Sequence, residues 1–370
     1  MSARFQLKPV STLEEVETQK IWVKPVPLDS LGALTLCDAQ HYCLAGGKKS
    51  FSHVDICSFD YSSNSLKIWR GSVSNWLQKT KMEQRASETL DKIVSSRPDF
   101  AGLDMSTTQL MGVVNVTPDS FSDGGKFLKP EAAIRHAKLL ILEGASIIDV
   151  GGESTRPGAI QITTTEEERR VIPVTQTLLK HNILVSVDTR NPEIMRTVLL
   201  EGVHIINDIS GFRNKECLSV IADAYKAGVY PNVVIMHMQG DPTTMQKSPT
   251  YNFAPIDIYM YLQGQIELLV SAGVLRSNIA VDVGFGFGKS VEDNLVLIDW
   301  MPMFHGLGVP ILAGVSRKST IAKLDKNAPV DKRLGGSIAL TLKLVDAGIQ
   351  IVRTHDVRQT AQAIKLWQAG

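Results

Sequence analysis

The chain has 370 residues, a formal net charge of +1 and a hydrophobic content of 44%. A chain of this length can bury a large core in one or two domains, and the composition is ordinary for a globular protein. The near-zero charge argues against nucleic acid or an anionic membrane surface as a partner. No apolar run is long enough to span a bilayer, and the N-terminus lacks the apolar segment of a secretory signal.

The cysteines indicate a reducing compartment. Four cysteines in a chain of this length do not form a disulfide framework, so we expect a cytoplasmic protein. Cys37, Cys43 and Cys57 lie near His41 and His53, which would suit zinc. Because no C-x-x-C pair is present, we favour structural thiols over a zinc site.

Residues 1–100 differ in character from the rest of the chain. They hold three of the five tryptophans and short alternating stretches such as residues 65–72, which predicts a small, partly β region. Residues 75–95 follow, with apolar side chains spaced for one face of an amphipathic helix. No motif here carries chemistry, so we interpret this part as an N-terminal accessory region with a linking helix.

From residue 109 onward, short apolar runs alternate with amphipathic segments. Strands that are apolar throughout are typical of a parallel sheet covered by helices on both faces. About eight repeats over roughly 260 residues match a (β/α)₈ TIM barrel, and we assign residues 101–370 to this domain. A doubly wound sheet is the alternative, but the repeat count favours a closed barrel. The eight runs are residues 110–116, 146–152, 184–189, 205–210, 233–238, 279–284, 311–316 and 351–357.

Helix ends are marked by glycines, which favour the backbone conformation of a helix C-cap. These are Gly144, Gly202, Gly228, Gly273 and Gly348.

Nearly every apolar run ends in a polar group. The carboxyl ends of barrel strands meet at one mouth, where such barrels carry their active sites. We therefore expect these side chains to converge on one cavity. They are Asn115, Asp149 with Glu153, Asp188, Asn207 with Asp208, His237, Asp282, Ser316, and Arg353 with His355.

Two runs carry a recognisable signature. Residues 111–125 read MGVVNVTPDSFSDGG, and residues 144–158 read GASIIDVGGESTRPG. Both resemble the signatures of the dihydropteroate synthases, pterin-binding transferases of folate biosynthesis, and the resemblance covers roughly residues 109–370. It implies condensation of p-aminobenzoate with (7,8-dihydropterin-6-yl)methyl diphosphate, giving 7,8-dihydropteroate and pyrophosphate.

A flat heterocycle rich in N–H groups would suit the strand-end acids. The carboxylates of Asp188 and Asp282, with the amide of Asn207, can accept hydrogen bonds from such an edge. The resemblance implies that these three residues hold the pterin, that Met236 packs against its ring and that Lys318 donates to it. It also implies catalytic roles for Asp188, Lys318 and Arg353.

An anion site is predicted beside the pterin. Arginine forks match phosphate oxygens, and Mg²⁺ is held by few protein ligands together with phosphates. The resemblance implies that the diphosphate contacts Thr155, Arg156, Arg353 and His355. It places Mg²⁺ on Asn115.

The second substrate would lie above the pterin. The resemblance implies that p-aminobenzoate contacts Arg156 and Ser316, and Phe287 and Phe121 are candidate walls for its ring. Sulfonamides should then compete with it. The family pattern also implies a homodimer, and residues 337–347 have a compatible apolar face. Val283 stands where the family commonly has proline.

Two other functions compete with this prediction. A pterin-binding methyltransferase barrel shares the acidic strand ends but does not need the diphosphate site. A degenerate barrel that only binds pterin is the non-enzyme alternative. Under the main interpretation, we expect Arg353→Ala to abolish turnover without changing the melting temperature.

Overall fold

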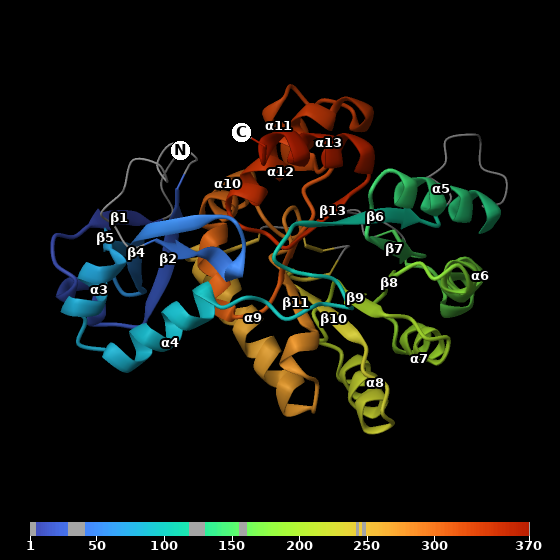
Figure 1. Ribbon diagram of the computed structural model, residues 1–370, viewed down its shortest axis with the longest axis horizontal. Coiled ribbons are helices and arrows are strands. Elements are labelled where there is room, and N and C mark those ends of the chain that lie inside the picture. The colour runs from blue at the N-terminus through green and yellow to red at the C-terminus, as the bar shows by residue number, and fades with distance from the viewer. Residues whose placement is uncertain are drawn as a thin grey trace.

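The computed structural model describes residues 5–28, 41–117, 130–154, 161–241, 244–245 and 249–369. Its larger part is a closed barrel whose eight strands all pair in parallel. Figure 1 shows this barrel ringed by helices. Going round the barrel, the order is β10-β11-β12-β13-β6-β7-β8-β9, with β13 paired to β6. The predicted TIM barrel is therefore confirmed, and the doubly wound sheet is excluded.

Each predicted apolar run overlaps one barrel strand. The strands are β6 (Gln109–Asn115), β7 (Ile147–Gly151), β8 (Val185–Asp188), β9 (Ile205–Asp208), β10 (Asn232–Met236), β11 (Ile279–Asp282), β12 (Ile311–Ala313) and β13 (Ile351–Thr354). The helices between and after them are α5 (Pro130–Leu142), α6 (Thr164–Lys180), α7 (Pro192–Leu200), α8 (Lys215–Lys226), α9 (Ala254–Ser271), α10 (Val291–Trp300), α11 (Ser319–Leu324), α12 (Leu334–Asp346) and α13 (Val357–Trp367). Short 3₁₀ helices are η2 (Arg276–Asn278), η3 (Met301–Leu307) and η4 (Val330–Lys332).

The five glycines expected at helix ends all have positive φ angles, between 77° and 109°. This is the backbone conformation that glycine adopts without steric cost, which explains why each helix stops where it does.

The barrel interior is filled by an apolar layer near its amino end. Met111, Ile147, Ile205, Leu312 and Ile351 belong to this buried cluster, one from each of five strands. Phe100 and Met105 join it from the segment that precedes β6. This segment thus closes the amino end of the barrel and leaves the carboxyl end as the open mouth.

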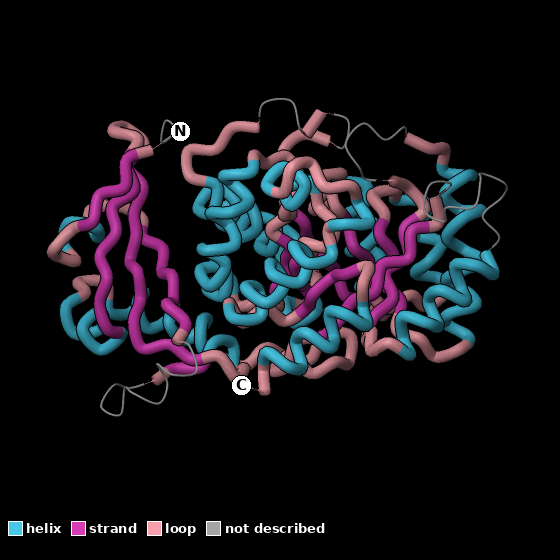
Figure 2. Tube along the Cα trace, turned by 90° about the horizontal axis from the view of Figure 1, so that it is seen from above, coloured by secondary structure: helices cyan, strands magenta, loops and turns pink. Residues whose placement is uncertain are grey.

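The N-terminal region forms a sheet with the order β1-β5-β4-β2, and β3 pairs with β4. β1 runs parallel to β5, and the other pairings are antiparallel. Figure 2 shows this sheet on one side of the barrel helices. Its elements are β1 (Gln6–Pro9), α1 (Glu14–Glu17), β2 (Ile21–Pro27), β3 (Tyr42–Cys43), η1 (Leu44–Gly46), β4 (Ser50–Asp60), β5 (Ser65–Ser72), α3 (Val73–Lys79) and α4 (Glu83–Val94).

The strands β2, β4 and β5 of this sheet bury side chains on both faces, whereas β1 is exposed. One face packs Val54, Ile56 and Trp69 against α3 and α4. The alternate residues Trp22, Cys57 and other side chains of the second face belong to the same apolar cluster as the barrel helices. Lys24 of β2 lies 5.0 Å from the ring centre of Trp300 in α10. The region is therefore a layer packed on the barrel.

One helix was expected over residues 75–95, but the structure has two. α3 ends at Lys79 because Thr80 is extended, and α4 begins at Glu83. The Thr80 hydroxyl donates to the Glu17 carboxylate, and Glu17 lies at the end of α1. This long-range bond holds the chain at the break, which helical periodicity alone does not reveal.

Candidate active site

The predicted site residues converge because side chains alternate along a strand. Residues two positions apart on a strand point to the same side, so Asp149 shares the interior side of its strand with Ile147, and Asn207 shares it with Ile205. Asp282 shares it with Ala280 in the same way, Met236 with Val234, and Arg353 with Ile351. The second layer of the barrel interior is therefore polar and lies at the mouth.

Arg353 lies at the centre of this polar layer. Its Nε is 2.6 Å from Oδ2 of Asp149 on β7, and one terminal nitrogen is 3.0 Å from Oδ2 of Asp188 on β8. The amide of Asn207 donates to the Oδ2 of Asp149 at 3.3 Å. Four strands thus supply one connected network.

The network fixes the charges at the mouth. Burial raises the pKa of Asp188, and the nearby guanidinium of Arg353 opposes that shift. Burial alone would lower the pKa of Arg353, but Asp149 and Asp188 together raise it. Asp149 is fully buried and Asp188 is 9% exposed, so both carboxylates need a paired cation, and Arg353 bonds to each of them.

Asp282 and Lys318 form the other side of the mouth. Burial raises the pKa of Asp282, whose Oδ1 accepts a hydrogen bond from the Gly284 N–H at 2.7 Å. Lys318 lies at the N-terminus of α11, with its Nζ 3.8 Å from the ring centre of Phe287. Burial, with Arg353 adding to it, lowers the pKa of Lys318 to about 7.

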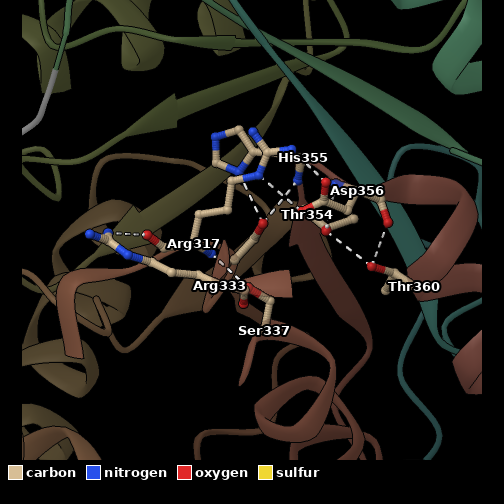
Figure 3. A network of polar contacts seen from close by, with 8 residues as sticks. Arg317, Arg333, Ser337, Thr354, His355, Asp356 and Thr360 are labelled. Atoms are coloured by element: carbon tan, nitrogen blue, oxygen red, sulfur yellow. Dashed lines mark hydrogen bonds and ion pairs between the residues drawn. The ribbon is translucent and has the colours of Figure 1, made fainter. Parts of the chain in front are cut away.

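Ser316 and His355 meet at the rim. The Ser316 hydroxyl lies 3.0 Å from Nδ1 of His355 and accepts from the His355 backbone N–H at 3.2 Å. Arg317 turns away to pair with Asp356, while its backbone N–H donates to Ser337. Figure 3 shows how these contacts link the end of β13 to α12. They fix Ser316 and His355 in place, and Arg317 serves as their support.

Asn115 suits a metal that is held mainly by other ligands. Asn115 is the last residue of β6 and is half-buried. Its Oδ1 lies beside Gly151 of β7, where an added Cβ would be 3.6 Å from that oxygen. Among the described residues, no group of three or more His, Cys, Asp or Glu side chains is arranged to hold a metal. A single amide oxygen fits Mg²⁺ that takes its remaining ligands from phosphates and water.

Some predicted residues cannot be placed. Thr155, Arg156 and Phe121 lie outside the described residues, so their roles stay predictions.

Of the thiols considered for zinc, Cys37 lies outside the described residues, and the others belong to no group of metal-binding side chains in the described part of the chain. Cys43, Cys57 and Cys217 are free thiols, and Cys57 is buried with its sulfur 3.4 Å from the Trp22 carbonyl oxygen.

In the described part of the chain, each helix is too short or too polar to cross a membrane.

Comparison with known proteins identifies the barrel. The model of the pterin binding enzyme family matches residues 111–355. Dihydropteroate synthase of Escherichia coli K12 is 41% identical over 268 residues, which is 72% of this chain and 93% of that protein. The Haemophilus influenzae enzyme is 43% identical and is covered over 95% of its length. The chain belongs to the dihydropteroate synthase family.

Solved structures agree with this assignment. Xanthomonas albilineans dihydropteroate synthase with 4-aminobenzoic acid aligns with a TM-score of 0.68 at 41% identity, covering 74% of this chain and 97% of that one. Burkholderia cenocepacia dihydropteroate synthase, complexed with 7,8-dihydropteroate, aligns at 0.65 and 38% identity, covering 72% and 92%. The family match begins at Met111, so the N-terminal layer precedes it.

Sequence reasoning missed two residues of this dihydropteroate synthase site. The sequence marks Asp149 only as a strand end, although it is the main partner of Arg353. Lys289 carries no signal in the sequence, yet it is only 2% exposed and contacts His237 beside the mouth. The strand alternation that places Asp149 beside Asn207 could have revealed the first. Nothing local in the sequence marks a buried lysine.

Proposed function

We propose that the protein is a dihydropteroate synthase that joins p-aminobenzoate to (7,8-dihydropterin-6-yl)methyl diphosphate and releases pyrophosphate. The observation that carries the proposal is the polar layer in which Asp188, Asn207 and Arg353 meet within hydrogen-bonding reach of Asp149. Relatives covered over more than nine-tenths of their length bear this activity in their names.

The pterin would be held at the mouth by acceptors on opposite sides. Asp188 has Oδ2 bonded to Arg353, and Asp282 has Oδ1 bonded to Gly284. Each carboxylate keeps its second oxygen for N–H groups of the pterin. The amide of Asn207 adds a further contact, and Lys318 can donate to the ring.

The floor of the site suits a flat ring. Met236 is 2% exposed and clusters with Ile209, Met238 and Met245. A thioether adapts well to an aromatic face. We assign Met236 to packing beneath the pterin.

The leaving group would lie toward β13 and β6. As the C–O bond breaks, negative charge develops on the diphosphate, and the guanidinium of Arg353 and the rim His355 can stabilise it. Thr155 and Arg156 are proposed to complete this set. Bound at Asn115, Mg²⁺ would neutralise part of the diphosphate charge.

The arylamine would enter over Phe287 and Ser316, with Arg156 proposed as the partner of its carboxylate. Its nitrogen attacks the methylene carbon of the pterin as the diphosphate departs, and the nitrogen then loses a proton. The carboxylate of Asp188 stabilises positive charge on the pterinyl-methyl carbon during this exchange. No side-chain nucleophile is needed.

Mass analysis of the products tests the proposal. Purified protein with both substrates and Mg²⁺ should give dihydropteroate and pyrophosphate in equal amounts, and a chelator should suppress both. A methyltransferase would release no pyrophosphate. A barrel that only binds pterin would retain the ligand without turnover.

We further propose a cytoplasmic homodimer that sulfonamides inhibit. The free thiols agree with a reducing compartment, and a relative from Yersinia pestis has been solved with a sulfonamide drug complex. Leu295 of α10 and Leu324 of α11 are 37% and 57% exposed beside α12. Light scattering should give twice the monomer mass for the wild type, and Leu324→Glu should shift it toward the monomer.

A further inference from the structure

Lys289 lies buried under the loop that joins β11 to α10. It is 2% exposed, and its ammonium donates to the carbonyl oxygens of Gly284 and Phe287 at 2.8 and 2.9 Å. It also lies 3.1 Å from Nδ1 and 3.3 Å from the carbonyl oxygen of His237, which follows β10. The ammonium therefore ties both ends of the loop to the neighbouring strand end.

The backbone of this loop needs such support. Gly284, Gly286 and Gly288 all have positive φ angles, of 68°, 81° and 58°. Three such residues within five positions leave few regular backbone bonds to hold the chain, so long-range donors and acceptors take over. The Gly286 N–H donates to Asn294, and Tyr251 donates to the Gly288 carbonyl oxygen. Lys289 is the charged member of this set.

The loop carries one wall of the proposed arylamine pocket. The Nζ of Lys318 lies over the ring of Phe287, 3.8 Å from the centre of that ring. The Lys318 side chain passes over Gly286 so closely that a Cβ there would lie 3.1 Å from Cδ of the lysine. The position of Phe287 and the path of Lys318 thus both depend on the conformation of residues 284–288.

We propose that Lys289 is a positioning residue for the aromatic amine substrate: by binding the carbonyl oxygens of residues 284 and 287 it fixes Phe287 and, through it, Lys318. The inference rests on the proposed function for the identity of that substrate. Among the proposed pterin contacts, Asp188 and Asn207 lie on other strands and keep their places, whereas Asp282 accepts from Gly284 and Lys318 lies over Phe287. We therefore expect a smaller loss for the pterin than for the arylamine.

The charge of Lys289 adds a second effect. Burial, opposed by the nearby carboxylate of Asp282 and aided by the ammonium of Lys318, lowers its pKa to about 7. When protonated, the two lysines add positive charge to this side of the mouth beside Asp282, which favours a carboxylate-bearing arylamine. An uncharged amide could bond to the carbonyl oxygens, but it would not supply this charge.

The test compares Lys289→Met with Lys289→Arg and with a control, Lys343→Met. Lys343 is 65% exposed and reaches Asp299 only at 3.9 Å. In Lys289→Met, KM for p-aminobenzoate should rise roughly tenfold while the Kd for the pterin diphosphate changes less than about threefold. Lys289→Arg should recover part of the loss, and Lys343→Met should match the wild type. Parallel losses in both substrates would overturn the proposal.

A second measurement needs no turnover. The amide of Phe287 bonds to the Gly284 carbonyl at 3.0 Å, so its hydrogen exchange reports the loop directly. Exchange there should speed up by roughly tenfold in Lys289→Met without a matching change in the β6 amides. Unchanged exchange would refute the positioning role of Lys289. A wild type that makes no dihydropteroate would instead refute the proposed function, and the exchange measurement would still test the positioning role. Should Lys289→Met not fold, Lys289→Ala, which also lacks a donor for the carbonyl oxygens, takes its place in both comparisons.

Discussion

Arg353 and Asp149 stand 204 positions apart in the chain, yet their side chains approach to 2.6 Å in the barrel interior. The second contact of Arg353, to Asp188, places this guanidinium between two buried carboxylates. The stability of the barrel and the chemistry of its mouth therefore share one ion network, and the first two predictions separate these roles.

Asp149→Asn should lower both stability and turnover. The substitution keeps the shape but leaves Arg353 with Asp188 alone, and breaking a buried ion pair costs about 3 kcal/mol. Turnover should fall about 100-fold, because a loosened guanidinium stabilises the leaving group less well. Urea unfolding and initial rates measure the two effects. The control Asp223→Asn removes an exposed pair with Lys226 and should change stability by less than about 0.5 kcal/mol. Equal effects of the two variants would contradict a central role for Asp149.

Arg353→Ala should abolish turnover and also lower the melting temperature. The sequence alone suggested an unchanged melting temperature, but the structure shows that two buried carboxylates would lose their partner. Burial raises the folded pKa of Asp188 above its ordinary 3.8. The protonated carboxyl therefore contributes stability to the fold below pH 3.8, and this stability is lost as pH rises through the folded pKa. In the wild type the pKa of Asp188 is about 7, and it is higher still without Arg353, so the stability gap between wild type and variant should widen as pH rises above about 7. A gap that is constant with pH would argue against carboxylate ionisation as the cause.

The pH dependence of arylamine capture should follow Lys318. Its pKa is lowered to about 7, so the ammonium is lost as pH rises through neutrality. Since kcat/KM reports the free enzyme, kcat/KM for p-aminobenzoate should decline above about pH 7. Lys318→Arg, whose side chain stays charged, should flatten this decline even if its absolute rate is lower. A wild-type profile that stays level to pH 9 would exclude this role for Lys318.

The N-terminal layer should be required for a stable barrel. Trp22 is 5% exposed in the shared apolar cluster, so Trp22→Ala should cost about 3–5 kcal/mol. Trp367 is 48% exposed at the end of α13, and Trp367→Ala should cost less than about 1 kcal/mol. The rate per folded molecule should be unchanged in Trp22→Ala because the layer lies away from the mouth. Equal stability of both variants would show that the layer is dispensable.

Much of the barrel could be predicted from local sequence. Strands buried on both faces must be apolar throughout, and a helix that ends against a turn needs glycine, as at Gly144 and Gly202. The strand ends Asp188, Asn207 and Asp282 could be placed at the mouth for the same reason, since a closed sheet has one carboxyl edge.

The remaining features depend on contacts between distant segments. Strand alternation can place Asp149 in the barrel interior, but its contact with Arg353 across 204 positions depends on how the strands lie against one another. A lysine is ordinarily exposed, so the burial of Lys289 follows only from the loop that wraps it. The packing of β2 and β4 on α10 depends on long-range contacts such as that of Lys24 with Trp300.

Binding of the pterin diphosphate tests the convergence of these residues most directly. Titration calorimetry on Asp188→Asn and Asp282→Asn should show affinity reduced by about tenfold or more in each, since each removes an acceptor for the same ligand. The exposed control Asp223→Asn should bind as the wild type does. If either site variant, correctly folded, bound the pterin diphosphate with wild-type affinity, the two carboxylates would not serve one cavity and the account would fail.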